Sequence, residues 1–119
     1  MKDSGTSIEG LTQLVAHFIA ERDWGQYHDP KNLSMLITTE AAELMEIFRW
    51  VDNKQSFSMV EDKRKEVEHE IADIFFGLLA FCHRAHIDLP QALHNKMIIN
   101  AQRYPVEKSK GNNKKYTEL

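Results

Sequence analysis

The chain has 119 residues, of which 42% are hydrophobic and 28% charged, and its formal net charge is −3 at pH 7. This length suits one domain with a single core, and the mildly acidic balance excludes the basic surface with which proteins bind nucleic-acid polymers or anionic membranes. No segment reaches the roughly 20 apolar residues of a membrane span, and the single cysteine, Cys82, cannot form an intrachain disulfide. We therefore expect a cytoplasmic protein without a membrane segment.

The first predicted helix begins at a capping box in residues 6–9 and extends to about Arg22. A loop with a glycine and a proline follows, and these residue types break helices. Trp24 in this loop either covers the end of the core, which is the commoner use, or lines a pocket for a flat base. The apolar residues of the first predicted helix recur at helical spacing on one face: Leu11, Leu14, Val15, Phe18 and Ile19.

The second predicted helix spans about residues 31–51 and carries two acids three residues apart, Glu40 and Glu43. At about 100° per residue, Glu40 lies in the middle of the apolar stripe that should face the core, and Glu43 lies about 60° to one side. Glu46 falls about 120° from Glu40, outside this stripe. Trp50 lies at the helix end on the same side as Glu43, where it could cap a site formed by the acids.

The third predicted helix spans about residues 58–86, begins at a second capping box, and repeats the pattern with Glu70 and Asp73. Glu70 again lies in the apolar stripe, and Asp73 lies about 60° to the same side. The segment that follows Glu70 is apolar on almost every face, and a small protein can bury such a helix only against a partner subunit. This predicts an oligomer with Phe75 or Phe76 in a subunit contact.

The fourth predicted helix has Asp88 as its N-cap and ends at a Tyr-Pro sequence. Lys96 and Asn100, one turn apart, form a polar pair on it. We take residues 1–105 as the domain. Residues 106–119 are rich in lysine and asparagine and show no helical periodicity, so we expect a basic, mobile tail.

Four acids on two apolar helix faces are costly to bury without cations. Two like charges about 4 Å apart repel by roughly 4 kcal/mol at an effective dielectric near 20. Oxygen ligands without cysteine or histidine favour Mg²⁺ or Mn²⁺, and Mg²⁺ usually takes further ligands from substrate phosphates. A single E-x-x-E is common on solvated helices, so the prediction of a metal site depends on the second copy. Such a site suits phosphoryl chemistry.

The E-x-x-E and E-x-x-D motifs stand in a longer pattern, with Glu-Arg-Asp-Trp before them and Lys-Met-x-Ile-Asn and then Arg-Tyr-Pro after them. This pattern resembles the MazG-like all-α nucleoside triphosphate pyrophosphatases, and within them the dCTP pyrophosphatase branch, over about residues 7–119. The resemblance implies a four-helix bundle whose subunits assemble through their helices into a homotetramer, a dimer of dimers. It also implies hydrolysis of a nucleoside triphosphate, such as dCTP or a modified dNTP, to the monophosphate and pyrophosphate as nucleotide-pool house-cleaning.

The same resemblance assigns roles to individual residues. Val15 and Gly77 depart from the dCTP branch, which has a histidine and a tyrosine at these positions, near the base or sugar. By position, the catalytic Mg²⁺ ligands are Glu40, Glu43, Glu70 and Asp73. The residues that line the base pocket, contact substrate phosphates or close the pocket are Trp24, Trp50, Lys96, Asn100 and Arg103.

Two other classes of function fit some of these features. A di-iron carboxylate bundle needs a glutamate on two helices and Glu-x-x-His on two others. The chain has one such motif, and its His69 lies about 100° off the acid stripe. A non-enzymatic helical interaction module would have no reason to bury acids. Metal-dependent release of pyrophosphate distinguishes the three functions.

Overall fold

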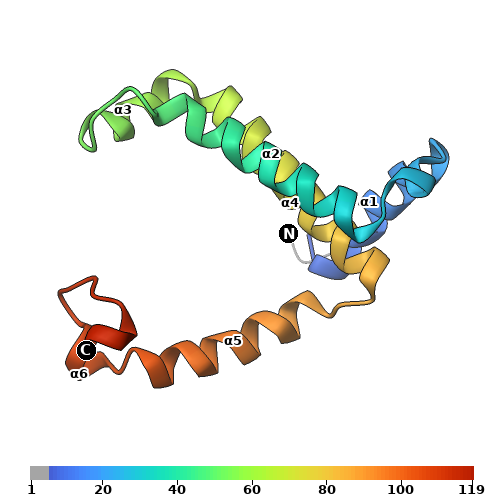
Figure 1. The fold of residues 1–119 in the computed structure, drawn as a ribbon. Helices are drawn as coiled ribbons and strands as arrows, with labels where there is room; N and C mark the ends of the chain where they lie inside the picture. Colours follow the sequence, from blue (N-terminus) through green and yellow to red (C-terminus); the bar gives the residue numbers. More distant parts are fainter. Residues whose placement is uncertain (1–5) are drawn as a thin grey trace. The chain divides into compact units, whose positions relative to one another are not determined.

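The computed structural model describes residues 6–119, and every regular element in this range is a helix (Figure 1). The prediction of an all-α fold is thereby confirmed. Contacts divide the chain into two compact units, residues 1–86 and residues 87–119. Within residues 6–119, no helix combines the length and the apolar content that crossing a bilayer requires.

Helix α1 (Ile8–Glu21) begins one residue later than the predicted capping box implies. Its N-cap is Ser7, whose hydroxyl oxygen accepts a hydrogen bond from the backbone N–H of Gly10 at 2.9 Å. After α1, Asp23 takes a left-handed backbone conformation with φ of 53°, and the short 3₁₀ helix η1 (Trp24–Tyr27) follows. The predicted loop therefore contains one helical turn.

Helix α2 (Pro30–Phe48) begins at the proline that was expected to break helices. Asp29 is its N-cap and accepts a hydrogen bond from the backbone N–H of Asn32 at 2.7 Å. Proline is well tolerated in the first helical turn because its missing N–H has no helical partner there. The helix ends at Phe48, three residues before the predicted end.

The prediction of one helix over residues 58–86 is wrong, since this range contains two helices, α3 (Gln55–Asp62) and α4 (Arg64–Ala85). Asp52 and Gln55 set the start of α3 by reciprocal capping. The Gln55 N–H donates to Asp52 Oδ1 at 2.7 Å, and the Asp52 N–H donates to Gln55 Oε1 at 3.1 Å. This is the geometry predicted for the capping box at residues 58–61, formed six residues earlier in the chain.

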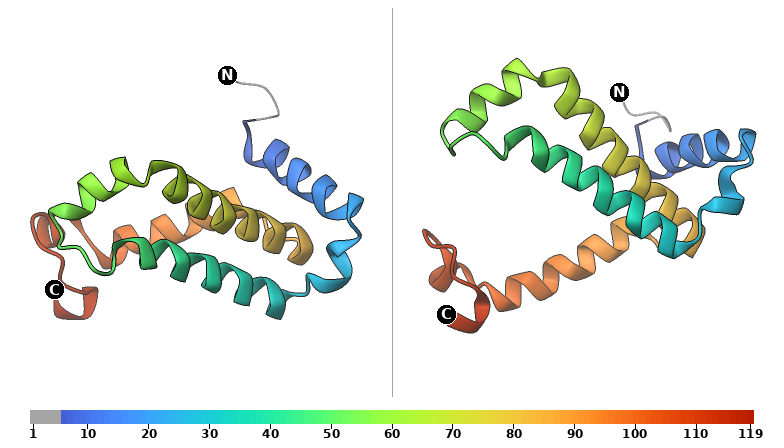
Figure 2. Two further views of the ribbon diagram at one scale, coloured as in Figure 1. Left: turned by 90° about the horizontal axis from the view of Figure 1, so that it is seen from above. Right: turned by 45° about the horizontal axis from the view of Figure 1, so that its top comes forward.

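Helices α2 and α4 lie side by side and form the core of the first unit (Figures 1 and 2). The buried apolar side chains come from these two helices: Leu33, Val67, Leu79 and Ala80. Gly77 of α4 permits their close approach, because a Cβ at this position would lie 2.8 Å from both Ile37 Cγ1 and Leu36 Cδ2. Helix α1 also packs on α4, and the rings of Phe18 and Phe76 meet edge-on with centroids 5.9 Å apart.

The second unit contains α5 (Leu89–Arg103), α6 (Val106–Ser109) and the 3₁₀ helix η2 (Tyr116–Glu118). Asp88 is the N-cap of α5, as predicted, and accepts a hydrogen bond from the backbone N–H of Gln91 at 3.0 Å. The Tyr116 ring contacts the Arg103 guanidinium, 4.6 Å from the ring centroid, and the Tyr104 ring at 5.9 Å. Residues 106–119 thus contain two short helices, and their mobility stays a prediction.

Candidate metal centre

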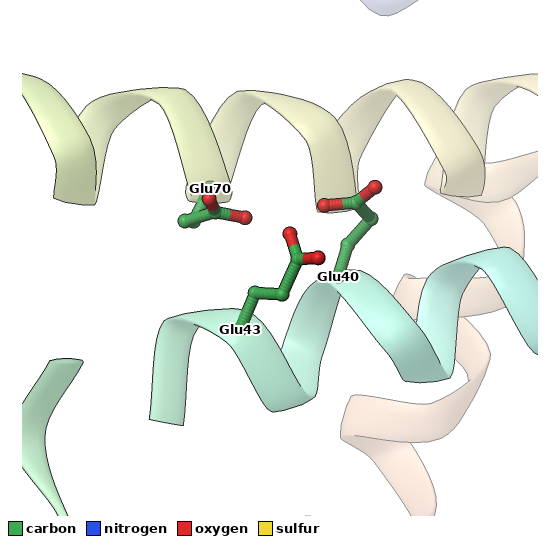
Figure 3. Close-up of side chains that lie close together, drawn as sticks. All are labelled: Glu40, Glu43 and Glu70. Atoms are coloured by element: carbon green, nitrogen blue, oxygen red, sulfur yellow. The ribbon is translucent and has the colours of Figure 1, made fainter. Parts of the chain in front are cut away.

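Three of the four predicted acids meet between α2 and α4. Glu40 and Glu43 extend from α2 and Glu70 from α4, and their carboxylates point toward one another (Figure 3). One oxygen from each residue lies within 4.8 Å of the others. We call these three residues the acid cluster. The paired stripes predicted by the helical wheel bring Glu40 and Glu70 together because α2 and α4 pack through those stripes.

Two oxygen atoms of the acid cluster are buried without partners. Glu40 and Glu70 are half-buried, whereas Glu43 is exposed. The Oε2 atoms of Glu40 and Glu70 are inaccessible to solvent and have no hydrogen-bond partner among residues 6–119. Buried carboxylate oxygens are normally satisfied, so two orphaned acceptors in one cluster indicate that a further group binds there.

Burial and mutual repulsion change how these acids titrate. Burial raises the pKa of Glu40 from 4.5 to about 7, with further contributions from the adjacent carboxyl of Glu43 and the charge of Asp73. The pKa of Glu70 is also raised, again chiefly by burial and then by Glu43. A bound cation would reverse both effects, because it stabilises the ionised carboxylates.

Asp73 is exposed on α4, one turn after Glu70, and lies outside the acid cluster. Its charge contributes to the raised pKa of Glu40 and of Glu70, so it lies within electrostatic range of both. Glu46, which the helical wheel placed off the stripe, pairs instead with Arg49 at 3.8 Å.

The acid cluster fits a hard divalent cation such as Mg²⁺ or Mn²⁺, because its ligands are all oxygen atoms and two of them have no other partner. Pairing of Glu70 with a nearby base is the structural alternative. In residues 6–119, however, Lys63 pairs with Glu66 at 3.7 Å and Arg64 pairs with Glu61 at 2.6 Å. No ion pair to Glu70 is found in this range.

The di-iron alternative requires a histidine among the ligands. His69 is exposed on α4, and the one candidate metal group within residues 6–119 consists of glutamates alone. A set of ligands without nitrogen argues against that alternative and favours an oxygen-binding ion.

The two predicted tryptophans are both accessible. Trp24 is 41% exposed, and its ring meets Phe18 edge-on at 5.6 Å. Because Phe18 also contacts Phe76, two ring contacts connect Trp24 to the helix that carries Glu70. Sequence reasoning assigned Phe18 only to the core, and its pairing with Phe76 has no local sequence signal. Trp50 is 84% exposed, with the Arg49 guanidinium 4.9 Å from its ring centroid.

The three residues predicted to contact substrate phosphates or close the pocket all lie on α5 in the second unit: Lys96, Asn100 and Arg103. Within that unit Arg103 stacks on Tyr116, and the Asn100 amide lies 4.0 Å from the sulfur of Met97. Their role toward the acid cluster stays a prediction.

The fold and the site define an all-α protein whose paired helices carry a carboxylate cluster suited to a hard cation. A family model described as the MazG-like family matches residues 35–119, and the chain belongs to this family. The matched range contains both acid motifs. The family predicted from the motifs is thereby confirmed.

Characterised relatives and a solved structure agree with this family. The chain is 40% identical over 115 residues to dCTP pyrophosphatase 1 of Mus musculus, and 38% identical over 117 residues to that of Homo sapiens. Each match covers 95% of this chain and 68% of the relative. The crystal structure of a pyrophosphatase from Archaeoglobus fulgidus DSM 4304 is similar with a TM-score of 0.80 and 40% identity, covering 82% of this chain and 92% of that one.

Proposed function

We propose that this chain is a metal-dependent nucleoside triphosphate pyrophosphatase, which hydrolyses a triphosphate to the monophosphate and pyrophosphate. The observation that carries the proposal is the acid cluster, with two buried oxygens that lack partners, on the packed helix pair of the chain. The 40% identity to a dCTP pyrophosphatase supports this chemistry. Neither an interaction module nor a di-iron protein accounts for both facts.

The acids are proposed to hold Mg²⁺, or Mn²⁺ in its place. When bound, such an ion neutralises charge on phosphate oxygens and lowers the pKa of an attacking water. Glu40 and Glu70 each offer the ion a buried oxygen that has no other partner among residues 6–119. Glu43 and Asp73 are exposed, so their carboxylates remain able to contact a bound ion or a water molecule.

The leading substrate is dCTP or a related or modified deoxynucleotide. The names of the relatives support this choice. Trp24 supports binding of a flat base, because its ring is partly exposed and linked through Phe18 to α4. Trp50 is proposed to line the same pocket. Lys96, Asn100 and Arg103 are proposed to contact the substrate phosphates or to close the pocket.

We propose a homotetramer, a dimer of dimers. Each unit leaves large apolar side chains uncovered by its own residues: Leu14, Met35 and Met45 in the first unit, and Leu93, Met97 and Ile98 in the second. Large apolar side chains that a subunit leaves exposed are typical of subunit contacts. Light scattering should give the mass of a tetramer, and a monomer at micromolar concentration would contradict the proposal.

We also propose a reducing, cytoplasmic location. The single cysteine, Cys82, is half-buried, and burial raises the pKa of its thiol. A thiol of this kind is a packing residue that needs no oxidising compartment.

The function is tested by measuring pyrophosphate release from canonical and modified triphosphates, with Mg²⁺ and with chelator. We expect pyrophosphate and the monophosphate as products, no activity in chelator, and the highest rate with a cytosine or modified deoxynucleotide. Release of orthophosphate and a diphosphate would place the attack at the γ-phosphate and overturn the assignment.

A further inference from the structure

A cavity of about 320 Å³ lies in the first unit, among α1, η1 and the C-terminal end of α4. Ala16, Ile19 and Ala20 of α1 and Ala80 of α4 are its apolar lining residues, and no member of the acid cluster lines it. Arg84, which lines the cavity, is fourteen positions after Glu70 on α4, about 21 Å along the helix axis. The cavity is therefore separate from the candidate metal centre.

The polar side chains of this cavity favour an anion. His28, His83 and Arg84 line it together with a single acid, Asp23. The Asp23 carboxylate is already engaged, because Gln26 Nε2 donates to its Oδ2 at 3.2 Å and to the Asp23 carbonyl at 3.0 Å. Arg84, in contrast, forms no ion pair or side-chain hydrogen bond with any residue between 6 and 119.

Two energetically unfavourable features lie at the same cavity. Asp23 has a left-handed backbone, with φ of 53° and ψ of 37°, which is uncommon for residues other than glycine. His28 has a buried Nδ1 atom without a hydrogen-bond partner among residues 6–119. Strained backbone and unsatisfied buried groups occur preferentially at binding sites, where the surrounding structure holds them.

We propose that this cavity binds a small organic oxyanion, with its apolar body against the alanine methyl groups and its phosphate or carboxylate paired with the Arg84 guanidinium. The planar fork of arginine matches two oxygens of such a group at once. A volume near 320 Å³ is at the lower end of the range for small-molecule sites, which suits a body of one ring. The proposal does not depend on the reaction proposed above.

A fluorescence titration of the full chain in chelator tests this site, because phosphate then cannot bind through a metal ion at the acid cluster. A Trp50→Phe background leaves Trp24 as the only tryptophan, and the Trp24 ring centroid lies 6.5 Å from that of His28. Phenyl phosphate is the probe, inorganic phosphate supplies the anion alone, and phenol supplies the ring alone. We expect a saturable change in Trp24 emission with phenyl phosphate. Inorganic phosphate and phenol should each bind at least about tenfold more weakly than phenyl phosphate.

Variants locate the binding. Arg84→Gln should weaken phenyl phosphate about tenfold or more, since a charge-assisted bidentate pair is lost. Arg64→Gln removes the same charge from the same helix twenty positions earlier and should leave the affinity unchanged. Ala20→Leu places a larger side chain in the cavity while the arginine remains, and it should abolish binding. Thermal melting establishes that each variant is folded.

Four results would overturn the proposal. The first is the absence of any saturable response to phenyl phosphate in the parent protein. The second is an equal loss of affinity in the two arginine variants, which would indicate a general charge effect. The third is undiminished binding in Ala20→Leu, which would place the anion outside the cavity. The fourth is equal affinity for inorganic phosphate and phenyl phosphate, which would show that the apolar wall does not contribute to binding.

Discussion

Glu40 on α2 and Glu70 on α4 extend toward each other across one helix contact, and each has an Oε2 atom buried without a hydrogen-bond partner (Figure 3). Two unsatisfied acceptors from separate helices form a site that is unfavourable when empty and favourable when a cation binds. Stability and activity should therefore respond in opposite directions when one of these charges is removed.

The first prediction concerns Glu40→Gln and Glu70→Gln. Without metal, each variant should melt no lower than wild type, because the change relieves repulsion within the acid cluster. Pyrophosphate release should fall by about a hundredfold or more, since a metal ligand is lost. Added Mg²⁺ should raise the melting temperature less than it does for wild type. Melting with and without Mg²⁺, together with product assays, measures all three effects.

Glu46→Gln is the matched control for this prediction, because Glu46 lies on the same helix and pairs with Arg49 outside the cluster. It should retain most activity and most of the Mg²⁺ effect. If Glu70→Gln lost stability without metal yet kept its activity, the glutamate would be a structural residue and the candidate metal centre would be wrong.

The second prediction is the pH dependence of the metal-free protein. Burial raises the pKa of Glu40 from 4.5 to about 7, so the folded state binds this proton more tightly than the unfolded state. The contribution of Glu40 to stability is therefore fully present below pH 4.5 and is lost as the pH rises toward 7. Denaturant melts across this window should show wild type losing stability relative to Glu40→Gln. A constant difference between the two proteins would contradict the raised pKa.

The third prediction concerns helix packing at Gly77. Glycine to alanine normally stabilises a helix interior by about 0.5–1 kcal/mol. In Gly77→Ala the new Cβ would lie 2.8 Å from Ile37 Cγ1 and from Leu36 Cδ2, and overpacking of this kind costs about 1–3 kcal/mol. We expect a net loss of roughly 1 kcal/mol or more in denaturant unfolding. Gly25→Ala is the control, since a Cβ there meets no atom within 4 Å, and it should be nearly neutral.

The fourth prediction concerns the C-terminal segment. Tyr116 contacts both Arg103 and Tyr104, and an exposed cation–π contact contributes about 0.5–1 kcal/mol. Tyr116→Ala should therefore speed trypsin cleavage after Lys114 several-fold and leave the main melting transition unchanged. Glu118→Gln, a change within the same short helix, should not affect cleavage. Equal cleavage of wild type and Tyr116→Ala would mean that the segment is already mobile.

Much of the candidate site follows from helical periodicity. The wheel placed Glu40 and Glu70 on apolar stripes, and stripes of this kind pack together wherever two amphipathic helices meet. It also separated Glu46 from the cluster. Periodicity does not show how far one helix is shifted along the axis of the other. It therefore could not establish that Glu43 belongs to the acid cluster while Asp73 lies outside it.

The errors in the fold occur where several local signals compete. Asp52–Gln55 and the later serine both offer a helix start, and the earlier pair forms the reciprocal bonds. The break between α3 and α4 falls at Lys63, a residue type that favours helix, and no glycine or proline marks it. The cavity beside Arg84 is formed by two segments far apart in the chain, residues 16–28 and residues 80–84, so no local pattern predicts it.

The close approach of α2 and α4 at Gly77 has a consequence for the proposed metal site. The absence of a side chain at this position lets the two backbones that carry Glu40 and Glu70 approach each other. Gly77 thus helps to set the distance between the two helices that carry the acid cluster, although it is not a member of the cluster. A change at residue 77 would therefore alter the proposed metal site through the spacing of the two helices, without removing any carboxylate.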